Sequence, residues 1–325
     1  GQPPEHLAQL TTPWAEAMVQ LVDFLYQQVF KDSTMAFRLT LLELPNLMAL
    51  LDYLGQRVEA DSSMAEQVAN TAGKIEQLLA PLNRPQALAR AVALRQQAAT
   101  ALPEWGQARF QNERLHIERL LGQGQLQAAY DQAQALRAQA QAVGPTAYSG
   151  ADYDLAMAYD MLGTVLFKAG QAAPALELFV EAQRLFEEMD GSRGARMASA
   201  ALTEQADCLR ALGRLEDAAA KYEERIRRGE GLEDFRGVAV GKGQLATVRM
   251  LQKRYEEAIA EYAAARTLFE QQNEPQSVAV IWHQTGMVYQ DAGQYDAAEA
   301  AYRQSLEIET QMGNQAGQAT SLTQL

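Results

Sequence analysis

The chain has 325 residues, of which 48% are hydrophobic and only 10 are proline, so it is long enough to bury a continuous core. Its formal net charge of −13 argues against a surface that binds nucleic acid or an anionic membrane. The single cysteine, Cys208, excludes internal disulfides, is compatible with a reducing compartment and is expected to pack in the core.

The first predicted helix is amphipathic. Pro13 opens it, and apolar residues then recur at steps of three and four, namely Trp14, Met18, Leu21, Leu25 and Val29. Its polar positions hold glutamine and acidic residues instead of lysine and arginine, which disfavours a helix that lies on a membrane. The spacing therefore predicts a helix that packs in the core.

A string that contains a proline lies between residues 32 and 59. Asp32 is a candidate N-cap, Pro45 must break or kink the helix that it enters, and Asn46 can cap the helix after the break. Part of the string resembles one found where the helical region of bacterial STAND signalling ATPases leads into their repeats; the matching residues are Glu43, Pro45, Asn46, Leu47 and Leu50.

Two more helical patterns between Asp61 and Leu102 complete a helical N-terminal region. They lack the register of the repeats nearer the C-terminus, so this region is either a set of degenerate repeats or a small separate bundle. Pro103 to Gly106 is the predicted junction. We therefore divide the chain into an N-terminal region, residues 1–105, and a repeat region, residues 106–325.

A unit of about 40 residues recurs in the repeat region. Its turns fall at Gly170, Gly213, Lys253 and Gly293, and a weaker unit turns at Gly124. Seven residues before each of the four turns stands a small residue, in order Gly163, Ala206, Ala246 and Gly286. Nine residues after each turn stands an aromatic one, in order Phe179, Tyr222, Tyr262 and Tyr302. This pattern predicts helical hairpins that stack on one another.

The last complete unit has the spacing of a tetratricopeptide repeat at Trp282, Gly286, Tyr289, Gly293, Tyr295, Ala298 and Tyr302. Its step near 40 residues is longer than the usual 34 and is similar to that of kinesin light chains and of bacterial STAND-type proteins. The resemblance implies an all-α, right-handed superhelical solenoid of helix-turn-helix repeats with an additional helical N-terminal region. Within a repeat, Gly286 is expected to lie against Ala298.

The C-terminal residues predict an incomplete repeat. Gly313 and Asn314 close a helix, and residues 315–325 begin another whose partner helix is absent. We expect a truncated last repeat in a segment of a longer protein, or a lone capping helix; the apolar Leu322 and Leu325 favour the first alternative.

No pattern for catalysis or for cofactor binding is recognisable. Gly73 and Lys74 lack the remainder of a phosphate-binding loop, and the three histidines, His6, His116 and His283, lack the spacing of metal ligands. We therefore expect no enzymatic activity, no cofactor and no metal from this chain.

The concave groove of such a solenoid is lined by the first helix of each repeat, at positions ten, six and three before the turn. The predicted partner-binding residues are Asp160, Thr164, Phe167, Thr203, Asp207, Arg210, Thr247, Met250, His283, Met287 and Gln290. This mixture of polar, phenylalanine and methionine side chains suits an extended peptide or a helix. We expect charge reversal of Asp160 and Asp207 to change stability by no more than about 0.5 kcal/mol.

The sequence thus predicts a cytoplasmic, non-enzymatic scaffold or sensor module that binds a protein or peptide and belongs to a larger bacterial signalling protein. Tetratricopeptide adaptors of heat-shock chaperones bind a carboxylate with lysine and asparagine, whereas Asp160, Thr164 and Thr203 stand at those places here. An acidic groove suits a basic or neutral partner. The alternatives are the ligand-sensing half of a regulator that binds a short peptide or small molecule, and the non-catalytic segment of a multidomain enzyme.

Overall fold

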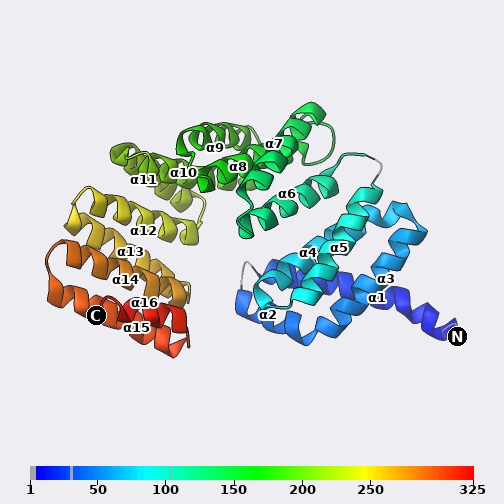
Figure 1. Cartoon of the computed structure of the whole chain (residues 1–325), viewed down its shortest axis with the longest axis horizontal. Coiled ribbons are helices and arrows are strands. Elements are labelled where there is room, and N and C mark those ends of the chain that lie inside the picture. The colour runs from blue at the N-terminus through cyan, green and yellow to red at the C-terminus, as the bar shows by residue number, and fades with distance from the viewer. Residues whose placement is uncertain (1–4, 30–31, 103) are drawn as a thin grey trace. The chain divides into compact units, whose positions relative to one another are not determined.

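The computed structural model describes residues 5–29, 32–102 and 104–325 (Figure 1). These residues form 16 α-helices and two short 3-10 helices and contain no strand, which confirms the predicted all-α class. None of the helices in this part of the chain combines the length and apolarity that crossing a membrane requires. Contacts divide the chain into two compact units, one that ends at Asp154 and one from Leu155 to Leu325. The boundary that we predict from the sequence, at residue 105, differs from this division by contacts, and it stays a prediction.

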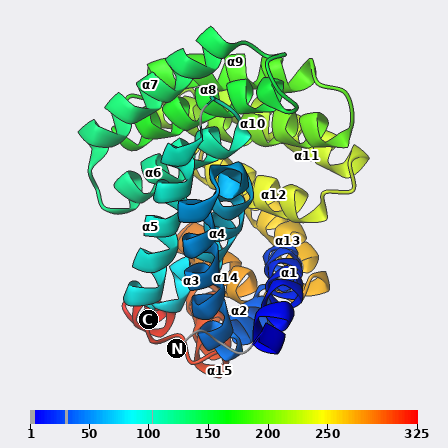
Figure 2. The ribbon, with the colours of Figure 1, turned by 90° about the vertical axis from the view of Figure 1, so that its right-hand side faces the viewer.

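The first unit is built around α4. Its helices are α1 (Glu5–Gln28), α2 (Ser33–Leu42), α3 (Leu44–Ala60), α4 (Ala65–Leu79), α5 (Pro85–Ala101), α6 (Gln107–Gly122) and α7 (Leu126–Val143). Helix α4 contacts α1, α2, α3, α5 and α6, and Figure 2 shows it beside α3 and α5. Val68, Ala72 and Ile75 of α4 are fully buried because neighbours cover several of its faces.

Helix α1 begins earlier than predicted. It starts at Glu5, so Pro13 lies inside the helix instead of opening it. The apolar positions after Pro13 do pack as predicted, because Met18 and Leu25 are buried and Trp14 contacts the same core from a partly buried position. This packing outweighs the backbone hydrogen bond that an internal proline removes.

The predicted break at Pro45 is confirmed. Helix α2 ends at Leu42, and α3 starts at Leu44 with Pro45 in its first turn, where the missing N–H has no helical partner to lose. Asp32 caps α2, since its Oδ1 atom accepts from the backbone N–H of Met35 at 2.9 Å. Asn46 does not cap α3. It already lies inside the first turn, and its Nδ2 atom donates to Oε2 of Glu43 at 2.7 Å.

The second unit consists of the predicted hairpins. Its helices are α8 (Ala151–Lys168), α9 (Ala172–Glu187), α10 (Ser192–Ala211), α11 (Leu215–Gly231), α12 (Phe235–Leu251), α13 (Tyr255–Gln271), α14 (Pro275–Asp291), α15 (Tyr295–Gln311) and α16 (Gln315–Leu322). The first four residues of α8 belong to the first unit. Each helix packs on the next in the chain from α9 to α16, which confirms a solenoid of helix-turn-helix repeats (Figure 1).

The predicted turns also adopt the expected backbone conformation. Gly170, Gly213 and Gly293 have φ of 77°, 73° and 73°, and Lys253 has φ of 61°. This left-handed conformation is natural for glycine and unfavourable for lysine, so the turn at Lys253 is held against local preference by the helices that it joins. The Gly293 turn ends α14, because Gln294 N donates to Tyr289 O at 2.8 Å.

The aromatic residue of each repeat lies in the core, and all four are at most 1% exposed: Phe179, Tyr222, Tyr262 and Tyr302. The expected pairing of Gly286 with Ala298 needs correction. A Cβ atom on Gly286 would lie 2.6 Å from the ring of Tyr302, so the ring is the nearest neighbour of this glycine. The aromatic side chain crosses over the small residue and fills the space between the two helices.

A second small residue recurs at the third position of α10, α12, α14 and α16 and has no counterpart in the predicted register. It is Gly194, Gly237, Ser277 and Gly317. A Cβ atom on Gly194 would lie 2.6 Å from the backbone oxygen of Phe186 at the end of the preceding repeat. The small residue therefore permits a close approach between consecutive repeats, whereas the register derived from the sequence described only contacts within a repeat.

Candidate functional site

The eleven predicted partner-binding residues lie on α8, α10, α12 and α14, the first helices of the four repeats. We call the surface that they form the first-helix face. Ten of the eleven are partly buried, and Gln290 is exposed. Intermediate exposure is what residues that line a shallow groove show. It does not identify a ligand, so the assignment of these residues to binding stays a prediction.

Three of these residues bond to the core tyrosines. Tyr222 Oη donates to Asp207 Oδ1 at 2.7 Å, and Tyr302 Oη donates to Gln290 Oε1 at 2.8 Å. Thr247 Oγ1 lies 2.8 Å from Tyr262 Oη. Burial raises the pKa of both Tyr222 and Tyr262, which keeps their hydroxyls protonated. The three groove residues therefore also stabilise their own repeats.

The tyrosine hydroxyls reach two different positions of the first-helix face. Tyr222 and Tyr262 stand opposite Ala206 and Ala246, and their hydroxyls reach the residue six before the turn. Tyr302 lies on Gly286, and its hydroxyl reaches Gln290, three before the turn. In that repeat the residue six before the turn is Met287, whose sulfur is a weak acceptor, whereas the amide oxygen of Gln290 accepts well.

An acidic cluster lies on α8 and α10. It contains Asp160, Asp207 and Glu204, the last of which the predicted register missed. Arg210 pairs with Asp207 at 3.0 Å. Burial, reinforced by the charge of Asp160, raises the pKa of Glu204 well above its usual range. Its Oε2 atom is buried and has no hydrogen-bond partner among the described residues. Glu204 is therefore protonated more readily than an ordinary surface carboxyl.

This geometry predicts a pH-dependent effect of Glu204→Gln. The folded chain holds a proton that the unfolded chain releases, so the parent loses stability as pH rises from the usual carboxyl pKa to the raised folded value. Glutamine has no such loss. We expect the melting temperature of the variant to exceed that of the parent by a margin that grows over this pH range. Thermal unfolding followed by circular dichroism measures it.

The matched control is Glu216→Gln, because Glu216 is an exposed acid on α11 of the same repeat. A margin that is constant with pH, or equal in the two variants, would show that Glu204 titrates like a surface residue.

Cys208, next to this cluster, is fully buried, which confirms its predicted place in the core. Burial, with the charges of Asp207 and Glu204, raises the pKa of its thiol to about 12. The thiol therefore stays protonated near neutral pH and is a poor nucleophile.

A hollow of about 400 Å³ opens on the first-helix face between α10, α12 and α14, with α13 behind it. Arg210 and Thr247 of the predicted set line it. Apolar side chains of Val240, Val280 and Ile281 border it, together with the amides of Gln244, Gln276 and Gln284. Gly243 contributes to the space, because a Cβ atom there would lie 3.2 Å from Cδ1 of Ile281.

The side chains that line the hollow are of the kinds that bind a peptide. An amide side chain both donates and accepts, so three of them match the backbone groups of an extended peptide, while Val280, 47% exposed, offers an apolar contact. Burial lowers the pKa of His283, and its ring lies 5.2 Å from that of Tyr302, so it is a neutral packing residue. Across the described residues, no three His, Cys, Asp or Glu side chains gather to hold a metal ion.

Comparison with known proteins identifies the repeats. Residues 238–311, which form α12 to α15, match the model of the tetratricopeptide repeat. These residues form tetratricopeptide repeats. The resemblance stated from the turn register is thereby confirmed, and the matched repeats provide most of the lining of the hollow. No curated protein sequence matches the chain at a significant level.

Solved structures of similar fold include RapI in its apo form, with a TM-score of 0.62 at 13% identity over 94% of this chain and 80% of that one. A Rap protein complexed with Competence and Sporulation Factor matches with a TM-score of 0.61 at 13% identity over the same shares. A putative kinesin light chain from Podosopora anserina matches with a TM-score of 0.53 at 16% identity over 63% and 96%. At these identities the similarity shows the fold alone.

Proposed function

We propose that the first-helix face binds an extended peptide or protein segment of neutral or basic charge and that the chain is a non-enzymatic scaffold or sensor module. The observation that supports this most directly is the hollow between α10, α12 and α14, where three amides and an exposed valine lie together. Peptide backbone would pair with the amides, and an apolar side chain of the partner would contact Val280.

The acidic cluster supports a preference for cations. Glu204 lies on α10, which borders the hollow, and Asp160 lies on α8 of the preceding repeat. Arg210, the cation in the lining of the hollow, is already paired with Asp207. A lysine or arginine of the partner that approached Glu204 would favour its ionised form and gain a charge-assisted hydrogen bond. Binding of a basic peptide should therefore release protons at pH values between the usual carboxyl pKa and the raised pKa of Glu204.

The fold supports a place in signalling. A Rap protein of the same fold has been solved with Competence and Sporulation Factor bound, so the fold is compatible with the sensor variant of the proposal. Cys208 is compatible with a reducing compartment. We accordingly assign the module to the cytoplasm and to a larger bacterial signalling protein.

Selection from a library of random peptides tests the proposal. We expect the selected peptides to be neutral or basic and to carry apolar side chains. Val280→Asp should weaken their binding by about tenfold or more, because it places a charge where an apolar side chain is bound. Leu251→Asp is the matched control, since Leu251 is equally exposed at the end of α12 and does not line the hollow.

Hydrogen exchange then locates the peptide. Protection on α10, α12 and α14 is the expected result. Equal loss in the two aspartate variants, or protection confined to α9, α11, α13 and α15, would show that the first-helix face is not the binding surface.

A further inference from the structure

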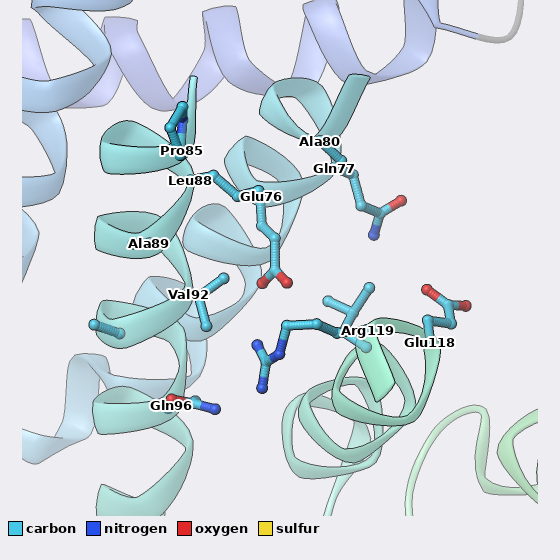
Figure 3. Close-up of a pocket in the computed structure, with 12 residues that line it drawn as sticks. Glu76, Gln77, Ala80, Pro85, Leu88, Ala89, Val92, Gln96, Glu118 and Arg119 are labelled. Atoms are coloured by element: carbon cyan, nitrogen blue, oxygen red, sulfur yellow. The ribbon is translucent and has the colours of Figure 1, made fainter. Parts of the chain in front are cut away.

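A second cavity lies in the first unit, far along the chain from the first-helix face. It encloses about 560 Å³ between α4, α5 and α6 (Figure 3). Its lining runs along α5 from Pro85 to Gln96, roughly 16 Å at the rise of an α-helix. The walls are largely apolar, with Leu88, Val92 and Leu115 facing the space. The volume falls within the range of small-molecule sites.

The two carboxylates that line this cavity both have cationic partners. Glu76 pairs with Arg95 at 2.6 Å, and Arg95 is only 1% exposed. Glu118 pairs with Arg114 along α6. A third acid of α6, Glu113, does not line the cavity and accepts from the amide of Asn112 at 3.0 Å. The negative charges around the cavity are therefore largely compensated or bonded.

Arg119, in contrast to these carboxylates, has no partner of opposite charge among the described residues. It lines the cavity, and no described residue forms an ion pair with it. Its Nη2 atom lies 2.7 Å from Nδ1 of His116, which must be neutral at that nitrogen in order to accept. Burial, with the charge of Arg119, lowers the pKa of His116 and favours this neutral form. The Nη1 atom of Arg119 is buried and has no hydrogen-bond partner among the described residues.

Figure 3 shows where this unsatisfied group points. The side chain of Arg119 extends from α6 toward α5, and its guanidinium lies between Glu76 and Gln96 in this view. A buried donor that carries a full charge is costly unless an acceptor reaches it, and an anionic acceptor compensates it best. The cavity thus combines an apolar trough with one guanidinium that lacks an anion.

We infer that this cavity binds a small-molecule monocarboxylate with an elongated apolar chain, with the carboxylate on Arg119 and the chain along α5. The ligand needs only one carboxylate, because Arg119 is the guanidinium of the lining without an ion-pair partner among the described residues. A second carboxylate on the ligand would be repelled by Glu76 or Glu118. The apolar chain is favoured by Leu88, Val92 and Leu115. This site is in the first unit and does not depend on the peptide-binding proposal.

Titration calorimetry of the whole chain with three probes of equal chain length tests the inference. The probes are decanoate, decanol and decyltrimethylammonium, each below the concentration at which it forms micelles. We expect decanoate to bind at one site and about tenfold or more tighter than decanol, and the cation to bind weakest. Equal binding of decanoate and decanol, or no binding of decanoate, would overturn the inference.

Variants identify the residues. Arg119→Met should remove the preference for decanoate and leave decanol unchanged, whereas Arg119→Lys, which retains the charge, should keep part of it. Arg90→Met is the matched control, because Arg90 is a cation of α5 that pairs with Asp52 outside this cavity. Val92→Asp should weaken both decanoate and decanol. Thermal unfolding establishes that each variant is folded.

Two results would contradict the assignment even if decanoate binds. One is an unchanged decanoate affinity in Arg119→Met with a folded variant. The other is an equal loss in Arg90→Met, which would mean that general charge, instead of Arg119, attracts the probe.

Discussion

Replacing Asp234 by alanine is expected to lower the free energy of unfolding by about 3–5 kcal/mol. Asp234 is the N-cap of α12 and accepts from the N–H of Gly237 at 3.0 Å. It also pairs with Arg225, whose side chain is 6% exposed. In the variant, the buried guanidinium would keep only the hydroxyl of Ser199, at 3.3 Å. Loss of the cap and an uncompensated buried charge act in the same direction.

Denaturant unfolding measures this effect, and the same chain offers a control. Asp217→Ala removes an acid that pairs with Arg214, but both of those side chains are more than half exposed, so about 0–1 kcal/mol is expected. The double variant Arg225→Met/Asp234→Ala should recover much of the loss, because no buried charge remains. If Asp234→Ala and Asp217→Ala unfold alike, the Arg225 pair does not stabilise the link between α11 and α12.

The same pair gives a pH dependence of the opposite sign to that of Glu204. Burial alone would raise the pKa of Asp234, but the bonds from Gly237 and Arg225 outweigh it and the pKa is lowered. Its stabilisation is therefore present above the usual carboxyl pKa and is lost as pH falls through the folded value.

The repeats could be predicted from the sequence because each of their determinants is local. The small residue before each turn, the turn itself and the aromatic residue after it lie within one hairpin, and they recur at Gly213, Lys253 and Gly293 with one spacing. Pattern alone therefore located α10 to α15 to within a few residues. The left-handed conformation of Lys253, which local propensity disfavours, was predictable only from its place in the register.

The bonds of Asp207 change the expected effect of its charge reversal, and these bonds depend on side-chain orientation that the sequence pattern does not give. Charge reversal there would remove the acceptor of the buried Tyr222 hydroxyl and the partner of Arg210, at a cost of about 1–3 kcal/mol. The forecast of about 0.5 kcal/mol treated Asp207 as a plain surface residue. Asp207→Asn retains an oxygen acceptor and is the better variant for a test of charge.

The contacts of the first unit could not be predicted in this way, because its helices do not share a repeated sequence register. Gly73 was considered only as part of an incomplete phosphate loop, whereas a Cβ atom there would lie 3.4 Å from Cδ of Arg95. This glycine therefore lies against the arginine that neutralises Glu76. Glycines inside predicted helices are the signal that sequence analysis can use, because Gly229 and Gly237 likewise lie against the side chain of Arg225.

Replacing Gly286 by leucine is expected to lower the free energy of unfolding by about 1–3 kcal/mol or more. The first side-chain atom alone would lie 2.6 Å from the ring of Tyr302, which is 1% exposed and has no free space to enter. The ring would have to leave its position and give up the hydrogen bond to Gln290. The damage thus combines overpacking with a buried hydroxyl that lacks its acceptor.

Three further variants distinguish the clash with the ring of Tyr302 from the change in helix propensity that any substitution of a glycine brings. Gly286→Ala should already destabilise the chain, although alanine favours helix, because Cβ is the atom that clashes. Gly55→Ala is the matched control, since a Cβ atom there makes an ordinary contact of 3.6 Å with Leu94 and should stabilise α3 by up to about 1 kcal/mol. Ala246→Gly should cost roughly that amount through helix propensity. If Gly286→Ala and Gly55→Ala shift the denaturation midpoint alike, the ring of Tyr302 moves freely and the close approach does not constrain the repeat.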